Sequence, residues 1–170
     1  MKIRAVAILA AWMATSVGTA SAASAPAVAI AKLDALPIVI SKPYDSSADA
    51  DVTVDAAIAR AKQTGKRVLI ELGGNWCPDC IILTNIMRLP EVAPFISSHY
   101  EVVLVDVGRL NKNRQIPARY GITQRLEGVP AVLIVDANGK LLNAGNIVAL
   151  DEAHNMEPQA IVNWLASWAG

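Results

Sequence analysis

Residues 74–80 read Gly-Asn-Trp-Cys-Pro-Asp-Cys, and they contain both cysteines of this 170-residue chain. Cys77 and Cys80 stand three positions apart, which is close to one turn of an α-helix. A short apolar stretch of strand type, residues 68–72, precedes the pair, and residues 81–89 follow it with helical spacing. The sequence therefore predicts that both cysteines lie where a buried strand leads into a helix.

This position predicts different tasks for the two sulfurs. If the helix begins at Cys77, its unpaired N–H groups and its dipole stabilise the thiolate form of that residue and make it the better nucleophile. Cys80, one turn further on, falls on the same face but deeper, where it is placed to attack a mixed disulfide formed at Cys77. We therefore predict an attacking Cys77 and a resolving Cys80.

The residues around the cysteines are candidates for contacting a substrate. Trp76 offers a flat apolar surface to an incoming peptide. Pro78 suits the first turn of a helix, where its missing N–H is harmless. Asp79 places a negative charge beside the thiols, which should oppose thiolate formation and favour a moderately reducing pair.

Two other interpretations of the pair remain open. A purely structural disulfide across so few residues would remove little entropy from the unfolded chain and would stabilise the fold weakly. A metal site needs about four ligands, and only His99 and His154 remain as borderline donors, neither in motif spacing. We expect both histidines to be ordinary surface residues, and we expect no metal or cofactor.

The rest of the chain predicts an α/β fold, with a central mixed β-sheet flanked by helices. Strands are expected at 68–72, 101–107 and 131–135, and a turn at 136–139 leads into a fourth strand from Lys140. Helices are expected at 53–62, with Thr53 or Asp55 as N-cap and Gly65 as the stop, and at 158–168. A short strand is also considered at the end of residues 23–42.

The beginning of the chain has the layout of a secretory signal peptide. Lys2 and Arg4 precede an apolar run, and small residues end at Ala22, so cleavage is expected there, with a retained anchor as the alternative. Residues 1–22 are thus predicted to be a leader, 23–42 a spacer and 43–170 one domain, located in the periplasm or secreted. Basic and acidic side chains number 15 each, so bulk charge predicts no binding to nucleic acid.

The strand, the Trp-Cys-Pro-Asp-Cys motif and the helix, followed by Gly128-Val129-Pro130 before a strand, resemble the thioredoxin superfamily. Residues 43–170 carry this resemblance. They look closest to exported thioredoxin-like domains of the kind found at the C-terminus of transmembrane reductant conductors. The resemblance implies a thioredoxin fold and a redox-active disulfide.

The resemblance also implies roles for residues outside the motif. Pro130 would follow a cis peptide bond, and the backbone of Val129 would pair with a bound substrate; the alternative is an ordinary turn proline. Glu71 matches a buried acid that helps to deprotonate the second cysteine, although a glutamate at a strand end could instead reach solvent. Asn85 departs from the family, because thioredoxin usually has a kinking proline there.

We therefore expect an exported thiol-disulfide oxidoreductase that reduces or isomerises protein disulfides through Cys77 and Cys80. Its partners would be disulfide-containing or dithiol proteins and a redox partner, such as a membrane reductant conductor, and the chain would act as a monomer. Two alternatives keep the same fold: a redox-inactive client-binding module, and a domain that delivers metal through the two thiolates.

Overall fold

The computed structural model describes residues 23–170. Its central sheet contains β1 (Arg67–Gly73), β2 (Tyr100–Asp106) and β3 (Ala131–Val135), in the order β2-β1-β3. β1 pairs in parallel with β2 and antiparallel with β3. The predicted mixed sheet is confirmed, and the strand that leads to the cysteines lies at its centre.

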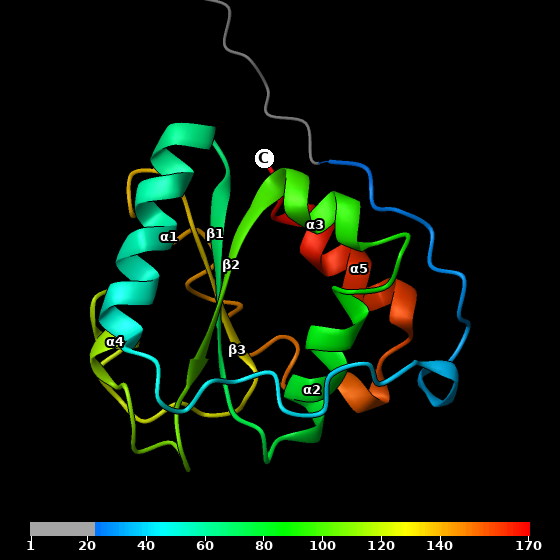
Figure 1. Ribbon diagram of the computed structural model, residues 1–170, viewed down its shortest axis with the longest axis horizontal. Coiled ribbons are helices and arrows are strands. Elements are labelled where there is room, and N and C mark those ends of the chain that lie inside the picture. Colours follow the sequence, from blue (N-terminus) through cyan, green and yellow to red (C-terminus); the bar gives the residue numbers. More distant parts are fainter. Residues whose placement is uncertain (1–22) are drawn as a thin grey trace, which may run out of the picture.

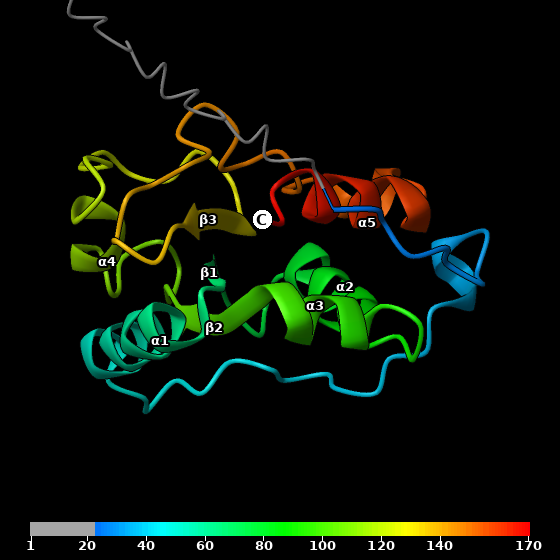
Figure 2. The same ribbon diagram turned by 90° about the horizontal axis from the view of Figure 1, so that it is seen from above.

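Helices cover both faces of this sheet (Figure 1). α1 (Ala50–Thr64) and α4 (Gln115–Ala118) lie on one face, whereas α2 (Pro78–Ile86), α3 (Ala93–His99) and α5 (Pro158–Ser167) lie on the other. Short 3-10 turns, η1 (Leu33–Ala35) and η2 (Ala153–Asn155), complete the elements described. Figure 2, a view from above, shows the three layers edge on.

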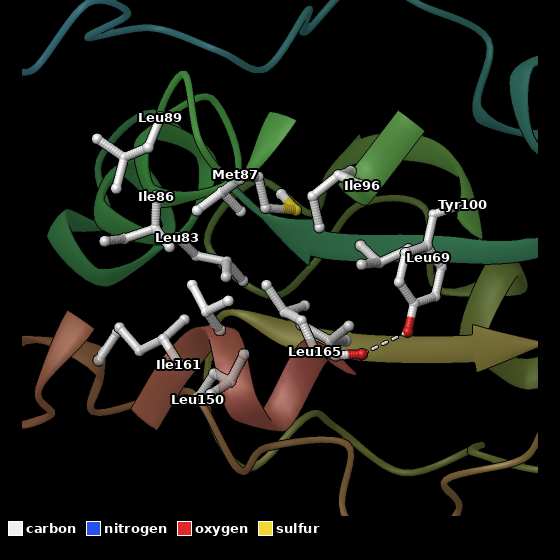
Figure 3. Packing of buried hydrophobic residues seen from close by; sticks show 14 of the residues in the cluster. Leu69, Leu83, Ile86, Met87, Leu89, Ile96, Tyr100, Leu150, Ile161 and Leu165 are labelled. Carbon is white, nitrogen blue, oxygen red and sulfur yellow. Dashed lines mark hydrogen bonds between the residues drawn. The ribbon is translucent and has the colours of Figure 1, made fainter. Parts of the chain in front are cut away.

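The side chains of β1 alternate between two hydrophobic clusters, as they must in a strand buried on both faces. Val68, Ile70 and Leu72 pack in the cluster under α1, and Leu69 packs in the cluster under α2 and α5. Figure 3 shows the second cluster, in which Leu69 meets residues of α2, α3 and α5. Glu71 shares the face of Leu69, so the strand carries its carboxylate beneath α2.

Three local expectations were wrong. Asp49, and not Thr53 or Asp55, caps α1, since its side chain accepts a hydrogen bond from the N–H of Val52 at 3.1 Å. The expected strand from Lys140 is reduced to a single antiparallel bridge between Leu141 and Val135. Residues 36–40 form no strand, and the N–H groups of Val39 and Ile40 instead donate to the side chain of Asn85. The stop at Gly65 is confirmed by a φ of 73°.

Residues 23–42, expected to be a spacer, contact the domain along their length. The N–H of Val28 donates to Oε1 of Gln159 at 2.8 Å, and the N–H of Ala29 donates to Oε1 of Glu91 at 2.9 Å. Leu36 is buried in the cluster under α2 and α5. The segment then runs past α2 to the start of α1 (Figure 1). Small apolar side chains, which suggested a linker, instead pack against the core.

The predicted leader, residues 1–22, lies outside the described residues. In the part of the chain that is described, no helix combines the length and the apolar character required to cross a membrane.

Candidate active site

Cys77 and Cys80 are joined by a disulfide at the N-terminus of α2, with their Cα atoms 5.3 Å apart. β1 ends at Gly73, a short loop follows, and Cys77 is the N-cap of the helix. Cys77 is 3% exposed and Cys80 is fully buried. The strand-to-helix position predicted from the sequence is therefore where the two sulfurs lie, and Cys77 is the one nearer the surface.

The sulfur of Cys77 occupies the place of a capping oxygen. The backbone N–H of Cys80 donates to Sγ of Cys77 at 3.1 Å. In the reduced protein the same N–H group and the helix dipole would favour a negative charge on this sulfur over a neutral thiol. Cys80, which lies inside the first turn, has no such donor among the hydrogen bonds of the described residues.

A second segment reaches the sulfurs from the other side of the site. The peptide bond between Val129 and Pro130 is cis, and the carbonyl oxygen of Val129 lies 3.4 Å from Sγ of Cys77. Pro130 is buried and directly precedes β3, whereas Val129 is only partly buried. Of the two residues implied by the family resemblance, Val129 thus lies against Sγ of Cys77, and Pro130 follows it at the start of β3.

Glu71 is fully buried, so it does not reach solvent at a strand end. Its Oε1 accepts a hydrogen bond from the hydroxyl of Tyr44 at 2.6 Å, and its Oε2 accepts one from Oγ1 of Thr84 at 3.4 Å. Burial raises the pKa of Glu71 to about 8, although the two hydrogen bonds pull it down. A carboxyl group with this pKa gains and loses its proton near neutral pH, which suits an acid-base role.

Asp79 is engaged in a way that the sequence did not indicate. Its Oδ1 accepts a hydrogen bond from the N–H of His154 at 2.7 Å and lies 2.8 Å from Nδ1 of the same residue. The carboxylate is therefore held by η2, on the flank of α2. The carboxylate is thus hydrogen-bonded by the backbone of His154 and is not a free charge beside the thiols. Pro78 stands exposed in the first turn of α2.

Trp76 lies at the rim of the site and is 38% exposed. Its Nε1 donates to the carbonyl oxygen of Gly108 at 2.5 Å, and the guanidinium of Arg109 lies over its ring, 4.5 Å from the centroid. The ring is thus fixed between a backbone acceptor and a cation. Arg109 adds a positive charge beside it.

The sequence analysis missed the contacts of three residues in this region. Tyr44 contacts Glu71, which is 27 residues away along the chain, and His154 contacts Asp79, which is 75 residues away. Asn85 contacts Ile40, which is 45 residues away. No motif spacing connects such distant positions: Tyr44 was not singled out, His154 was expected to be an ordinary surface residue, and Asn85 was noted only as a departure from the usual proline.

Asn85 binds the backbone of residues 39–40. Its Oδ1 accepts hydrogen bonds from the N–H groups of Val39 and Ile40 at 2.9 and 3.1 Å, and its Nδ2 donates to the carbonyl oxygen of Ile40 at 2.9 Å.

Within residues 23–170, no group of three or more His, Cys, Asp or Glu side chains is arranged to hold a metal ion.

Known proteins agree with this geometry. The sequence model of the thioredoxin-like family matches residues 49–137. A solved structure described as the disulphide isomerase from Xylella fastidiosa Temecula1 is 36% identical, with a TM-score of 0.67, over 73% of this chain and 94% of that chain.

Two further solved structures are less similar. A DsbH oxidoreductase is 21% identical over 66% of this chain and 94% of its own, with a TM-score of 0.43. A protein of unknown function from Pseudomonas aeruginosa is 20% identical over 72% of this chain and 86% of its own, with a TM-score of 0.41. No curated protein matches the chain. The family match and the 36% identical structure carry the assignment: the chain belongs to the thioredoxin-like family and is a thiol-disulfide oxidoreductase.

Proposed function

We propose that this protein is an exported enzyme that reduces or isomerises disulfides in other proteins, acting as a monomer once residues 1–22 have been removed. The observation that carries the proposal is the unequal placement of the two sulfurs. Cys77 is 3% exposed and caps a helix beside the Val129 carbonyl, while Cys80 is fully buried in a cluster with Tyr44, whose hydroxyl binds the acid Glu71. The 36% identical structure, described as a disulphide isomerase, supports the same substrate class.

The first step is attack by Cys77. Its thiolate displaces one sulfur of a substrate disulfide, so a mixed disulfide forms at Cys77 and one substrate thiolate leaves. The carbonyl oxygen of Val129 lies 3.4 Å from Sγ of Cys77 and can accept a hydrogen bond from a backbone N–H of an extended substrate. Trp76 and Pro78 provide the adjoining contact surface.

The second step is resolution by Cys80. Its thiol gives a proton toward Glu71, and the resulting thiolate attacks Sγ of Cys77, which releases the second substrate sulfur as a thiolate. The substrate gains two electrons and the enzyme is left with the Cys77–Cys80 disulfide. A dithiol partner protein, such as a membrane reductant conductor, then returns two electrons to the enzyme. In isomerisation, a substrate thiol in place of Cys80 resolves the mixed disulfide.

Reduction of insulin tests this proposal. The mature chain, supplied with dithiothreitol, should accelerate insulin reduction, and Cys77→Ser should lower the rate by about a thousandfold or to the uncatalysed level. A matched variant, Arg125→Ala, changes an exposed residue of the rim and should retain activity. Wild-type protein that does not accelerate the reaction, or a Cys77→Ser variant that retains the wild-type rate, would contradict the proposal.

A further inference from the structure

A buried tyrosine forms a hydrogen bond with the buried acid Glu71. Tyr44 is 3% exposed, and its hydroxyl donates to Oε1 of Glu71 at 2.6 Å. The other oxygen of Glu71 has the more distant donor, Oγ1 of Thr84 at 3.4 Å. Because Glu71 is itself fully buried, the tyrosine hydroxyl is its principal contact with the rest of the site.

The same hydroxyl lies next to the resolving sulfur. Tyr44, Cys77 and Cys80 pack together in one buried cluster. A Cβ atom placed at Gly73 would lie 2.4 Å from the hydroxyl oxygen of Tyr44 and 2.7 Å from Sγ of Cys80. Since both atoms lie this close to a single point, at most about 5 Å separates them across the bare backbone of Gly73. Any side chain at Gly73 would stand between them.

Tyr44 is held in this position by the active-site loop. Oδ1 of Asn75 accepts the backbone N–H of Tyr44 at 2.9 Å, and Nδ2 of Asn75 donates to the carbonyl oxygen of Tyr44 at 2.8 Å. Asn75 lies two positions before Cys77, so the loop that presents the attacking sulfur also fixes the tyrosine. The hydroxyl is therefore positioned by two backbone contacts and one side-chain acceptor.

We propose that Tyr44 relays the proton between Cys80 and Glu71. During resolution the thiol proton of Cys80 passes to the hydroxyl oxygen of Tyr44, while the hydroxyl proton of Tyr44 passes to Oε1 of Glu71. The Cys80 sulfur then forms its bond to Cys77, the bond from Cys77 to the substrate breaks, and the substrate sulfur leaves with the electron pair. Tyr44 ends the step unchanged, and Glu71 ends it as a carboxylic acid. This relay rests on the proposed function.

The electrostatic surroundings suit a neutral relay. Burial and the nearby Glu71 carboxylate raise the pKa of Tyr44 far above its ordinary value, so its hydroxyl remains protonated over the working range. Asp106, at the end of β2, acts in the same direction. Nζ of Lys112 lies 3.6 Å from that carboxylate and balances its charge. Tyr44 can thus pass a proton only by accepting one as it donates another.

Rapid mixing with dithiobis(nitrobenzoate) tests the relay. The first nitrobenzoate thiolate released reports attack by Cys77, at a rate that depends on reagent concentration, and the second reports resolution by Cys80, at a rate that does not. In Tyr44→Phe we expect the first phase to stay within about twofold of wild type and the second to slow about tenfold or more. We also expect the rate of the second phase to depend on pH differently in this variant than in wild type.

Tyr100→Phe is the matched control. It also removes a buried hydroxyl that donates at 2.6 Å, but to the carbonyl oxygen of Leu165 in α5. Both phases should remain as in wild type. A Tyr44→Phe variant whose second phase keeps the wild-type rate and pH dependence overturns the relay and leaves the proposed function standing. Wild-type protein that releases no second thiolate overturns the proposed function itself.

A measurement on wild type keeps the relay testable if Tyr44→Phe does not fold. The rate of the second phase is measured in mixtures of light and heavy water. A relay moves two protons in one step and predicts a curved dependence on the deuterium fraction. A straight line, the result for one moving proton, would overturn the relay.

Discussion

The two sulfurs of the Cys77–Cys80 disulfide are neighbours, yet their surroundings differ in kind. Cys77 caps a helix, accepts a backbone N–H and faces the cis peptide of Val129 and Pro130. Cys80 is fully buried among side chains that include Tyr44, whose hydroxyl binds the carboxyl group of Glu71. One turn of helix therefore separates a site that stabilises negative charge from a site that disfavours it. In the proposed function, this difference assigns attack to one of two identical functional groups and resolution to the other.

Alkylation of the reduced protein should reveal the largest difference between Cys77 and Cys80. At about pH 7, iodoacetamide should modify Cys77 at least about 100-fold faster than Cys80, because reaction requires an accessible thiolate. In concentrated urea the ratio should fall toward one, since the helix and the burial are lost. Mass spectrometry of digested protein at timed intervals measures both rates. Equal rates in the folded protein would remove the basis of the comparison.

Glu71→Gln tests the buried side through stability. The pKa of Glu71 is raised from 4.5 in its ordinary state to about 8 in the folded chain. Between these values the folded chain holds a proton that the unfolded chain has lost. The stability contributed by this group is thus complete below the ordinary pKa and is lost as pH rises through about 8.

Glu71→Gln carries no charge at any pH, so it should gain stability relative to wild type as pH rises. The gain should be on the order of a few kcal/mol at about pH 9 and should vanish near pH 4. Urea unfolding across this range measures it. Glu101→Gln, in β2, is the control, because the partly buried carboxylate of Glu101 is paired with Arg60 and Lys66, so this variant should gain no stability as pH rises. A difference that does not vary with pH would contradict the burial argument.

Arg109→Ala tests the exposed side, where a smaller effect is expected. The cation stacked over Trp76 fixes the ring and adds positive charge beside it, and such contacts at exposed sites are worth about 0.5–1 kcal/mol. Attack by Cys77 should slow by about two- to fivefold, and resolution should not change. The two phases of thiolate release separate these rates. An equal loss in both phases would show that the two sides are not independent.

Much of this arrangement could be predicted from residues that are close in sequence. The strand, the motif and the helix follow one another closely, so local patterns were enough to place Cys77 and Cys80 and to put Glu71 in the strand, whereas the burial of Glu71 was implied only by the family resemblance. The cis Val129–Pro130 segment was inferred from family resemblance, since nothing local distinguishes it from an ordinary turn proline. Its position against Sγ of Cys77 depends on the fold.

The remainder depends on contacts between distant segments. Residues 23–42 looked like a linker because alanine and proline are common in linkers, and only the amide of Asn85 and the surface of α5 show that they pack on the domain. Tyr44 lies in a region without regular structure, and its partner Glu71 belongs to β1. His154 gave no signal either, because a single histidine predicts neither its partner nor its position.

Capture of a mixed disulfide tests the division of labour most directly. Reduced Cys80→Ser and reduced Cys77→Ser are each incubated with oxidised insulin, quenched with acid and analysed by mass spectrometry. The account predicts that Cys80→Ser accumulates an insulin adduct at Cys77, while Cys77→Ser accumulates none at Cys80 on the same timescale. Equal accumulation by the two variants, or an adduct only at Cys80, would contradict it.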